Sequence, residues 1–215
     1  MANDVSKPLR FHAAQALLPQ GWARDVRIDC VGGQITALTT GVPRDAGAQA
    51  LGVVVPGLGN LHSHAFQRAM AGLTEVGGRS GDSFWSWREL MYRFLDRLTP
   101  DDLQAVAEQA YVEMLESGFT RVGEFHYLHH APDGQRYADH AEMAGRIAAA
   151  AYSTGLGLTL LPVFYAHSDF GGAAPLPGLA EFGSDGVWRG YLVSLCRRIA
   201  SATGRDPARI AFRGY

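Results

Sequence analysis

Residues 53–64 read VVVPGLGNLHSH, and this stretch decides the fold of the chain. An apolar, β-branched run breaks at Pro56–Gly57, resumes briefly and ends in two histidines two positions apart. Side chains at positions i and i+2 of a strand point to the same side, so we expect His62 and His64 to lie side by side. Two imidazoles at a strand end suit a divalent metal such as zinc, whose catalytic sites use about three protein ligands and one open position. The alternative is a pair of histidines that only form hydrogen bonds.

The composition indicates a globular protein. The chain has 215 residues, of which 47% are hydrophobic and 19% are charged, so it can bury a core. Its net charge is −2 and it has no long basic run, which argues against nucleic acid as a partner. No apolar stretch is long enough to cross a bilayer, and residues 1–8 lack the apolar core of a signal peptide. Cys30 and Cys196 fit no metal-binding spacing and are expected as ordinary reduced thiols. We therefore expect a soluble, cytoplasmic protein with no membrane partner.

Residues 1–55 are expected to form a small β module. Apolar and polar residues alternate over 25–30, which is typical of a strand with one wet face. Further strands are expected over 9–12 and 34–38, and Gly32–Gly33 supplies a hairpin turn between the second strand and the third.

After Pro56 the pattern changes to alternating strands and helices. The first expected helix is capped by Asp82 or Ser83 and has apolar positions from Phe84 to Leu98, and the second is capped by Thr99 and stopped by Gly118. A strand is then expected over 119–126, followed by a helix that a capping box at 139–142 opens and that ends near Gly155. The last expected elements are a strand over 156–164 and a helix over 187–200. This βαβαβ order calls for a parallel sheet or barrel.

Polar side chains end each expected strand after Pro56. These are His62 and His64, then Glu124, His126 and Tyr127, then Tyr165 and His167. The active site of a (β/α)8 barrel lies at the carboxyl ends of its strands, so this pattern favours an enzyme with that fold. A doubly wound sheet is the alternative, but no Gly-rich phosphate loop follows the first strand.

Several longer motifs accompany the two histidines. They are LLPQGWARDV at 17–26, PGLGNLHSHAFQR at 56–68, DSFWSWRELMYR at 82–93, EFHYLHH at 124–130 and LLPVFYAH at 160–167. Together they resemble the formimidoylglutamate deiminases, a family of the amidohydrolase superfamily, over residues 9–174. The resemblance implies an α/β fold: an amidohydrolase-type (β/α)8 TIM barrel, here truncated after about three to four strands, with a small N-terminal β-sandwich module.

The resemblance also implies a reaction and a set of site residues. The reaction is the zinc-dependent hydrolysis of the formimino C–N bond in histidine degradation, which yields N-formyl-L-glutamate and ammonia. His62 and His64 match two ligands of one divalent metal ion. Gln67, Arg88 and Tyr127 match positions that hold a small dicarboxylate substrate, whose carboxylates need cationic and hydroxyl partners. A homodimer is a possible assembly.

The sequence departs from this family beyond about residue 175. A barrel typically takes about 250 residues, more than follow Pro56 here. The family's later strands carry a third metal-binding His, a catalytic Glu, a catalytic His and a metal-binding Asp, which match no position of this sequence. We therefore expect a truncation, or a frameshift near residue 175, with weak metal binding and no turnover. The expected segments are the β module at 1–55, the first barrel units at 56–174 and a divergent tail at 175–215.

Two other functions stay open. One is a superfamily deaminase acting on a purine or triazine, although Arg88 and Tyr127 suit a dicarboxylate better than a flat heterocycle. The other is an inactive fragment that folds partly or with a partner. Simpler interpretations also exist for single residues. Arg88 can be a solvated helix residue and Tyr127 a packed aromatic, while His129 and His130 are expected as solvated loop residues.

Overall fold

The computed structural model describes residues 7–73, 84–163 and 185–203. The chain divides into two compact units, Met1–Gly57 and Leu58–Tyr215, which we describe separately. None of the helices within the described ranges combines the length and the apolar character needed to cross a membrane.

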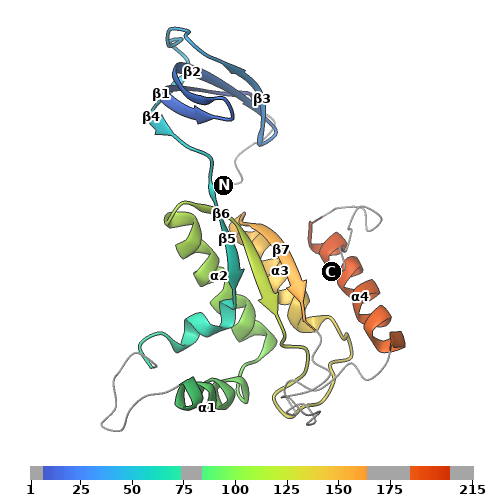
Figure 1. The fold of residues 1–215 in the computed structure, drawn as a ribbon. Helices are drawn as coiled ribbons and strands as arrows, with labels where there is room; N and C mark the ends of the chain where they lie inside the picture. Colours follow the sequence, from blue (N-terminus) through green and yellow to red (C-terminus); the bar gives the residue numbers. More distant parts are fainter. Residues whose placement is uncertain (1–6, 74–83, 164–184, 204–215) are drawn as a thin grey trace. The chain divides into compact units, whose positions relative to one another are not determined.

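The first unit is a four-stranded sheet. Its strands are β1 (Leu9–Leu18), β2 (Gly21–Val31), β3 (Gln34–Thr39) and β4 (Gln49–Val54), in the order β3-β2-β1-β4 (Figure 1). The β1–β2 and β2–β3 pairs are antiparallel, whereas β4 joins β1 in parallel. The β module is therefore observed, and within the described residues it is one mixed sheet instead of the two sheets of a sandwich.

Local sequence explains both the turn and the core of this sheet. Gly32 and Gly33 have φ of +59° and +74°, the left-handed conformation that a two-residue hairpin turn requires. Val26 and Ile28 are buried, as the alternation over 25–30 predicts. In contrast, Trp22 is 61% exposed.

The second unit contains a three-stranded parallel sheet flanked by helices. The strands β5 (Leu58–Ser63), β6 (Phe119–His126) and β7 (Gly157–Pro162) lie in the order β5-β6-β7 (Figure 1). The helices are the 3-10 helix η1 (Ala65–Met70), α1 (Phe84–Leu95), α2 (Pro100–Glu116), α3 (Glu142–Thr154) and α4 (Asp185–Thr203). Strand, helix and parallel strand follow each other as expected, which confirms the predicted barrel-type α/β fold. Asp82, Ser83, Tyr165 and His167 lie outside the described residues.

Helix α2 begins where the sequence predicts. The hydroxyl of Thr99 accepts a hydrogen bond from the Asp102 amide, and the Asp102 carboxylate accepts one from the Thr99 amide, at 3.2 and 3.1 Å. This reciprocal capping box satisfies two amides that a helix start otherwise leaves unpaired. Pro100 occupies the first turn, where no amide hydrogen is needed.

Helix α3 begins differently from the prediction. The predicted capping box at 139–142 is wrong, because the residue preceding the helix is Ala141, which makes no side-chain cap. Asp139 instead accepts a hydrogen bond from the Ala141 amide in the preceding turn. The Glu142 carboxylate pairs with two arginines, Arg146 and Arg198, so it does not return to the Asp139 amide.

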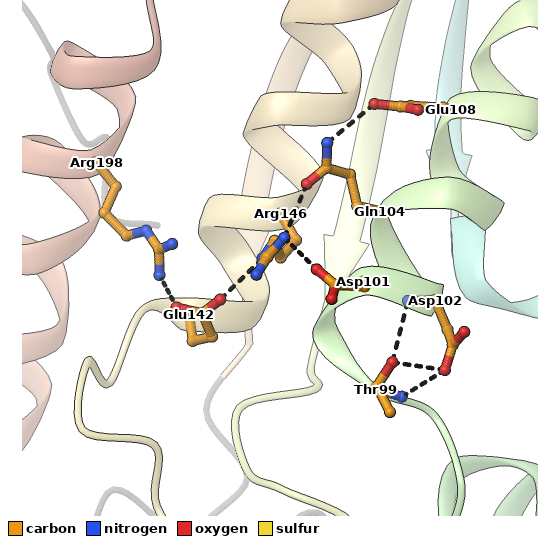
Figure 2. A network of polar contacts seen from close by, with 8 residues as sticks. All are labelled: Thr99, Asp101, Asp102, Gln104, Glu108, Glu142, Arg146 and Arg198. Atoms are coloured by element: carbon orange, nitrogen blue, oxygen red, sulfur yellow. Dashed lines mark hydrogen bonds and ion pairs between the residues drawn. The ribbon is translucent and has the colours of Figure 1, made fainter.

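Those arginines belong to a polar network that joins three helices (Figure 2). Arg146 on α3 contacts Glu142 on its own helix and Asp101 on α2, at 2.8 and 2.7 Å. Arg198 on α4 contacts Glu142 as well. The shared carboxylate therefore ties α4 to α3, and Arg146 ties α3 to α2. The apolar core lies between α2, α3 and the sheet, where Leu103, Tyr111, Val122 and Ile147 are almost fully buried.

Replacement of the α2 cap should destabilise the second unit. Thr99→Ala removes the hydroxyl that accepts from Asp102, so we expect the free energy of unfolding to fall by about 1 kcal/mol in urea titrations. Thr99→Ser keeps the hydroxyl and should unfold within about 0.5 kcal/mol of the unmodified chain. Equal unfolding midpoints for Thr99→Ala and the unmodified chain would contradict this account.

Candidate metal centre

The structure brings His62 and His64 together at the end of β5. Their Nε2 atoms are 3.0 Å apart, and the two rings stand perpendicular with centroids 4.6 Å apart. Strand β5 ends at Ser63, and His64 immediately precedes η1. The strand end therefore presents both rings to one point, as the i, i+2 spacing predicts.

A main-chain contact fixes the chemical form of His64. Its Nδ1 lies 2.8 Å from the Phe125 carbonyl oxygen on β6, and only a protonated Nδ1 can donate to that acceptor. The other nitrogen, Nε2, then carries a lone pair when the ring is neutral. Burial lowers the pKa of His64, which favours the neutral ring. The result is the tautomer in which a histidine binds a metal through Nε2 while its other nitrogen is held by a carbonyl.

The donor set fits a divalent metal as a pair of ligands. Two neutral imidazoles suit zinc, and the 3.0 Å separation of the Nε2 atoms lets both face one ion. Across the described ranges no group of three or more His, Cys, Asp or Glu is arranged to hold a metal. Within the described residues, His62 and His64 thus form a candidate pair of metal ligands without a third such side chain grouped with them.

Gln67 and Tyr127 lie beside the histidine pair. The rings of Tyr127 and His64 are 5.1 Å apart, and the Gln67 amide donates to the Tyr127 hydroxyl at 3.5 Å. The Met91 sulfur on α1 lies 3.8 Å from the same hydroxyl. Two predicted substrate-binding residues thus share one polar cluster next to the candidate metal site.

Arg88 lies on the same helix as Met91 but has a different neighbour. Its Nε donates to the Tyr92 hydroxyl at 2.8 Å, and its guanidinium lies 5.3 Å from the centre of that ring. Positions 88 and 91 share a helix face because they are three residues apart. Arg88 therefore lies on the same face of α1 as Met91, whose sulfur contacts Gln67 and Tyr127.

The histidines that follow β6 are buried, which corrects the expectation for His129 and His130 as solvated loop residues. They are 6% and 7% exposed, and His126 is 3% exposed. The His129 ring packs between His126 and Tyr191 of α4, and its Nε2 contacts the Val163 carbonyl at 2.9 Å. Sequence reasoning missed this cluster because its cover comes from a helix about sixty residues away. The run of histidines in EFHYLHH was the only local signal.

The comparisons with known proteins agree with this arrangement. Residues 10–50 match the family described as "Formimidoylglutamate deiminase HutF, N-terminal domain", and residues 53–176 match the "Amidohydrolase family". This chain belongs to the amidohydrolase family. The resemblance drawn from the sequence motifs is thereby confirmed.

Individual relatives also place the chain in the amidohydrolase family. Over 171 residues the chain is 53% identical to the formimidoylglutamate deiminase of Pseudomonas aeruginosa, covering 79% of this chain and 38% of that protein. A crystal structure of an amidohydrolase from Brucella melitensis matches with a TM-score of 0.80 and 55% identity, covering 91% of this chain and 43% of the other. The atrazine chlorohydrolase of Arthrobacter aurescens, solved with zinc and atraton, matches with a TM-score of 0.62 and 18% identity, covering 90% and 42%. This last likeness shows the fold alone. The chain spans about two fifths of the length of these relatives.

The buried histidines should make the amidohydrolase chain sensitive to acid. Burial lowers the pKa of His129 to about 4 and that of His126 well below its usual range. The unfolded chain binds protons at these histidines from about pH 6.5 downward, before the folded chain does, so acid favours unfolding. We expect His129 alone to cost about 3 kcal/mol of stability between pH 6.5 and pH 4.

Urea unfolding at pH 7 and at pH 4.5 measures this effect. His129→Gln cannot take up the proton, so its stability should fall less over this pH range than that of the unmodified chain. A matched control is His140→Gln, which replaces a less buried histidine of the same segment. The same pH dependence for His129→Gln and the unmodified chain would show that His129 does not titrate on unfolding.

Proposed function

We propose that this chain carries two metal ligands and the substrate-recognition cluster of a cytoplasmic, zinc-dependent formimidoylglutamate deiminase. The reaction is the hydrolysis of N-formimino-L-glutamate to N-formyl-L-glutamate and ammonia, a step of histidine degradation. The observation that carries the proposal is the His62–His64 pair, held by β6 and placed next to Gln67 and Tyr127. The 53% identity to a formimidoylglutamate deiminase supports the substrate.

The histidines would hold the metal in this proposal. His64 is poised for this role because the Phe125 carbonyl occupies its Nδ1 and leaves Nε2 to bind. His62 presents its Nε2 from the same side of the strand end. A zinc ion, when bound, makes water a nucleophile at neutral pH and polarises the bond that is attacked.

The neighbouring side chains would bind and orient the substrate. The hydroxyl of Tyr127 and the amide of Gln67 are hydrogen-bond donors, and a carboxylate oxygen accepts such bonds strongly. Arg88 offers a guanidinium, the group best matched to a carboxylate in shape and charge. The Met91 sulfur lies beside the donors of Gln67 and Tyr127 and is only a weak acceptor, so a carboxylate oxygen would replace it as their partner. A linear dicarboxylate can use all three polar groups, whereas a purine or triazine ring brings no carboxylate for the Arg88 guanidinium to bind.

Removal of one histidine should weaken zinc binding. His64→Ala leaves a single imidazole at the end of β5, so we expect zinc affinity to fall at least tenfold in calorimetric titrations with ZnCl₂. His140→Ala removes a histidine outside the candidate site and should bind zinc as the unmodified chain does. Unchanged zinc affinity in both His62→Ala and His64→Ala would refute the metal assignment.

Loss of the Tyr127 hydroxyl should weaken binding of the dicarboxylate. Tyr127→Phe keeps the packed ring and removes one hydrogen bond to a charged group, worth about 2 kcal/mol. We expect the zinc-loaded variant to bind N-formyl-L-glutamate more than tenfold more weakly than the unmodified chain, measured by NMR titration. Tyr152→Phe, which removes the hydroxyl of an exposed tyrosine on α3, serves as the matched control and should leave binding unchanged.

The same preparation discriminates between substrate classes. Ammonia release from N-formimino-L-glutamate is compared with release from guanine, each with zinc present. Preference for the dicarboxylate in binding or turnover supports the proposal. Binding of guanine in preference to N-formyl-L-glutamate would instead assign the site to a purine deaminase.

A further inference from the structure

Glu124 is a buried carboxyl group on the strand next to the histidine pair. It lies on β6 and is 1% exposed. Its Oε1 accepts a hydrogen bond of 2.7 Å from the amide of Ala65, the residue directly after His64. The register also pairs Glu124 with Ser63, the residue directly before His64. One side chain of β6 therefore reaches the main chain on which His64 is carried.

The neighbour of Glu124 holds the ring of the same histidine. The carbonyl of Phe125 accepts the hydrogen bond from His64 Nδ1. Two consecutive residues of β6 thus bind the two residues that follow β5. Glu124 accepts from the main-chain amide of Ala65, and Phe125 accepts from the imidazole of His64. The amide contact fixes where the turn into η1 lies, and the imidazole contact fixes how the ring is rotated. In the structure that has both contacts, Nε2 of His64 faces Nε2 of His62 at 3.0 Å.

The strands approach each other closely at this point. A Cβ added at Gly123 would lie 2.9 Å from the Leu61 carbonyl oxygen, so only glycine allows the observed spacing there. This approach sets Glu124 within reach of the turn that follows His62 and His64.

Packing alone does not account for a carboxyl group at this position. A buried carboxyl group is costly unless donors compensate it, and apolar residues of similar volume often serve stability better. Burial raises the pKa of Glu124, whereas the Ala65 amide and the hydroxyl groups of Ser63 and Tyr111 act in the opposite direction. Two of these three groups, Ser63 and Ala65, flank His64, whereas Tyr111 lies on α2. The hydrogen bond that the structure shows to this carboxyl group is the one from the Ala65 amide to Oε1.

We propose that Glu124 is a positioning residue for the His62–His64 pair: it holds the turn at Ala65 so that both Nε2 atoms face one metal ion. This proposal rests on the proposed metal role of the two histidines. In this proposal Glu124 is not a ligand of the metal or of the substrate, and it acts through the main chain of His64 and Ala65.

The test compares zinc binding in the full 215-residue chain and three variants. Glu124→Met keeps the length of the side chain and removes both acceptors. Glu124→Gln keeps an acceptor oxygen for the Ala65 amide. Val122→Ala is the matched control, because it weakens the buried part of the same strand without touching the turn. Zinc affinity is measured by titration with ZnCl₂ and corrected for the folded fraction, and the ¹⁵N shifts of the His64 ring report its tautomer.

We expect Glu124→Met to bind zinc about 10 to 100 times more weakly and to lose the single His64 tautomer. Glu124→Gln should restore affinity to within about threefold, and Val122→Ala should lose stability with little change in affinity. Unchanged affinity and tautomer in folded Glu124→Met would overturn the proposal. A Glu124→Met chain that stays unfolded even in trimethylamine N-oxide, which favours compact states, would also overturn it by assigning Glu124 to fold stability. His62→Ala and His64→Ala separate the two proposals, since unchanged zinc binding in both would instead refute the metal role itself.

Discussion

The close parallel pairing of β5 with β6 is the constraint on which the second unit depends. It brings the Phe125 carbonyl within 2.8 Å of His64 Nδ1 and the Glu124 carboxylate within 2.7 Å of the Ala65 amide. These contacts give His64 a defined direction and tautomer beside His62. A histidine pair on an isolated strand would share the spacing but not the tautomer, because the second nitrogen of His64 would have no fixed partner.

The helices around the sheet serve the same strand ends. Helix α2 contributes Leu103 and Tyr111 to the apolar core beside the sheet, and α3 contributes Ile147 to the same core. Helix α1 contributes Met91, whose sulfur contacts the polar groups of Gln67 and Tyr127. The site is thus assembled from segments that are close only after folding. The candidate metal centre takes its two histidines from the local motif at 62–64, and the surrounding helices determine which other side chains lie beside them.

Local chemistry was the part of this structure that the sequence predicted well. The Thr99 cap, the Gly32–Gly33 turn and the strand over 119–126 each follow from a few neighbouring residues, and the structure has all three. The failures concern groups whose partners are far along the chain. His129 is buried by Tyr191, and Glu142 is drawn from its expected cap by Arg198. The hydrogen-bond partner of Glu124 was equally hidden, because the donor is an amide fifty-nine residues away. Such contacts carry no periodic signal, so spacing rules cannot reveal them.

The bare Cα of Gly123 has a consequence for how this protein can change over evolutionary time. The atom that a side chain would meet there is the main-chain oxygen of Leu61, which cannot rotate aside as a side chain could. Any replacement must therefore widen the gap between two strands that together orient the imidazoles. Drift at this position is restricted by geometry that no neighbouring substitution of a side chain can relieve.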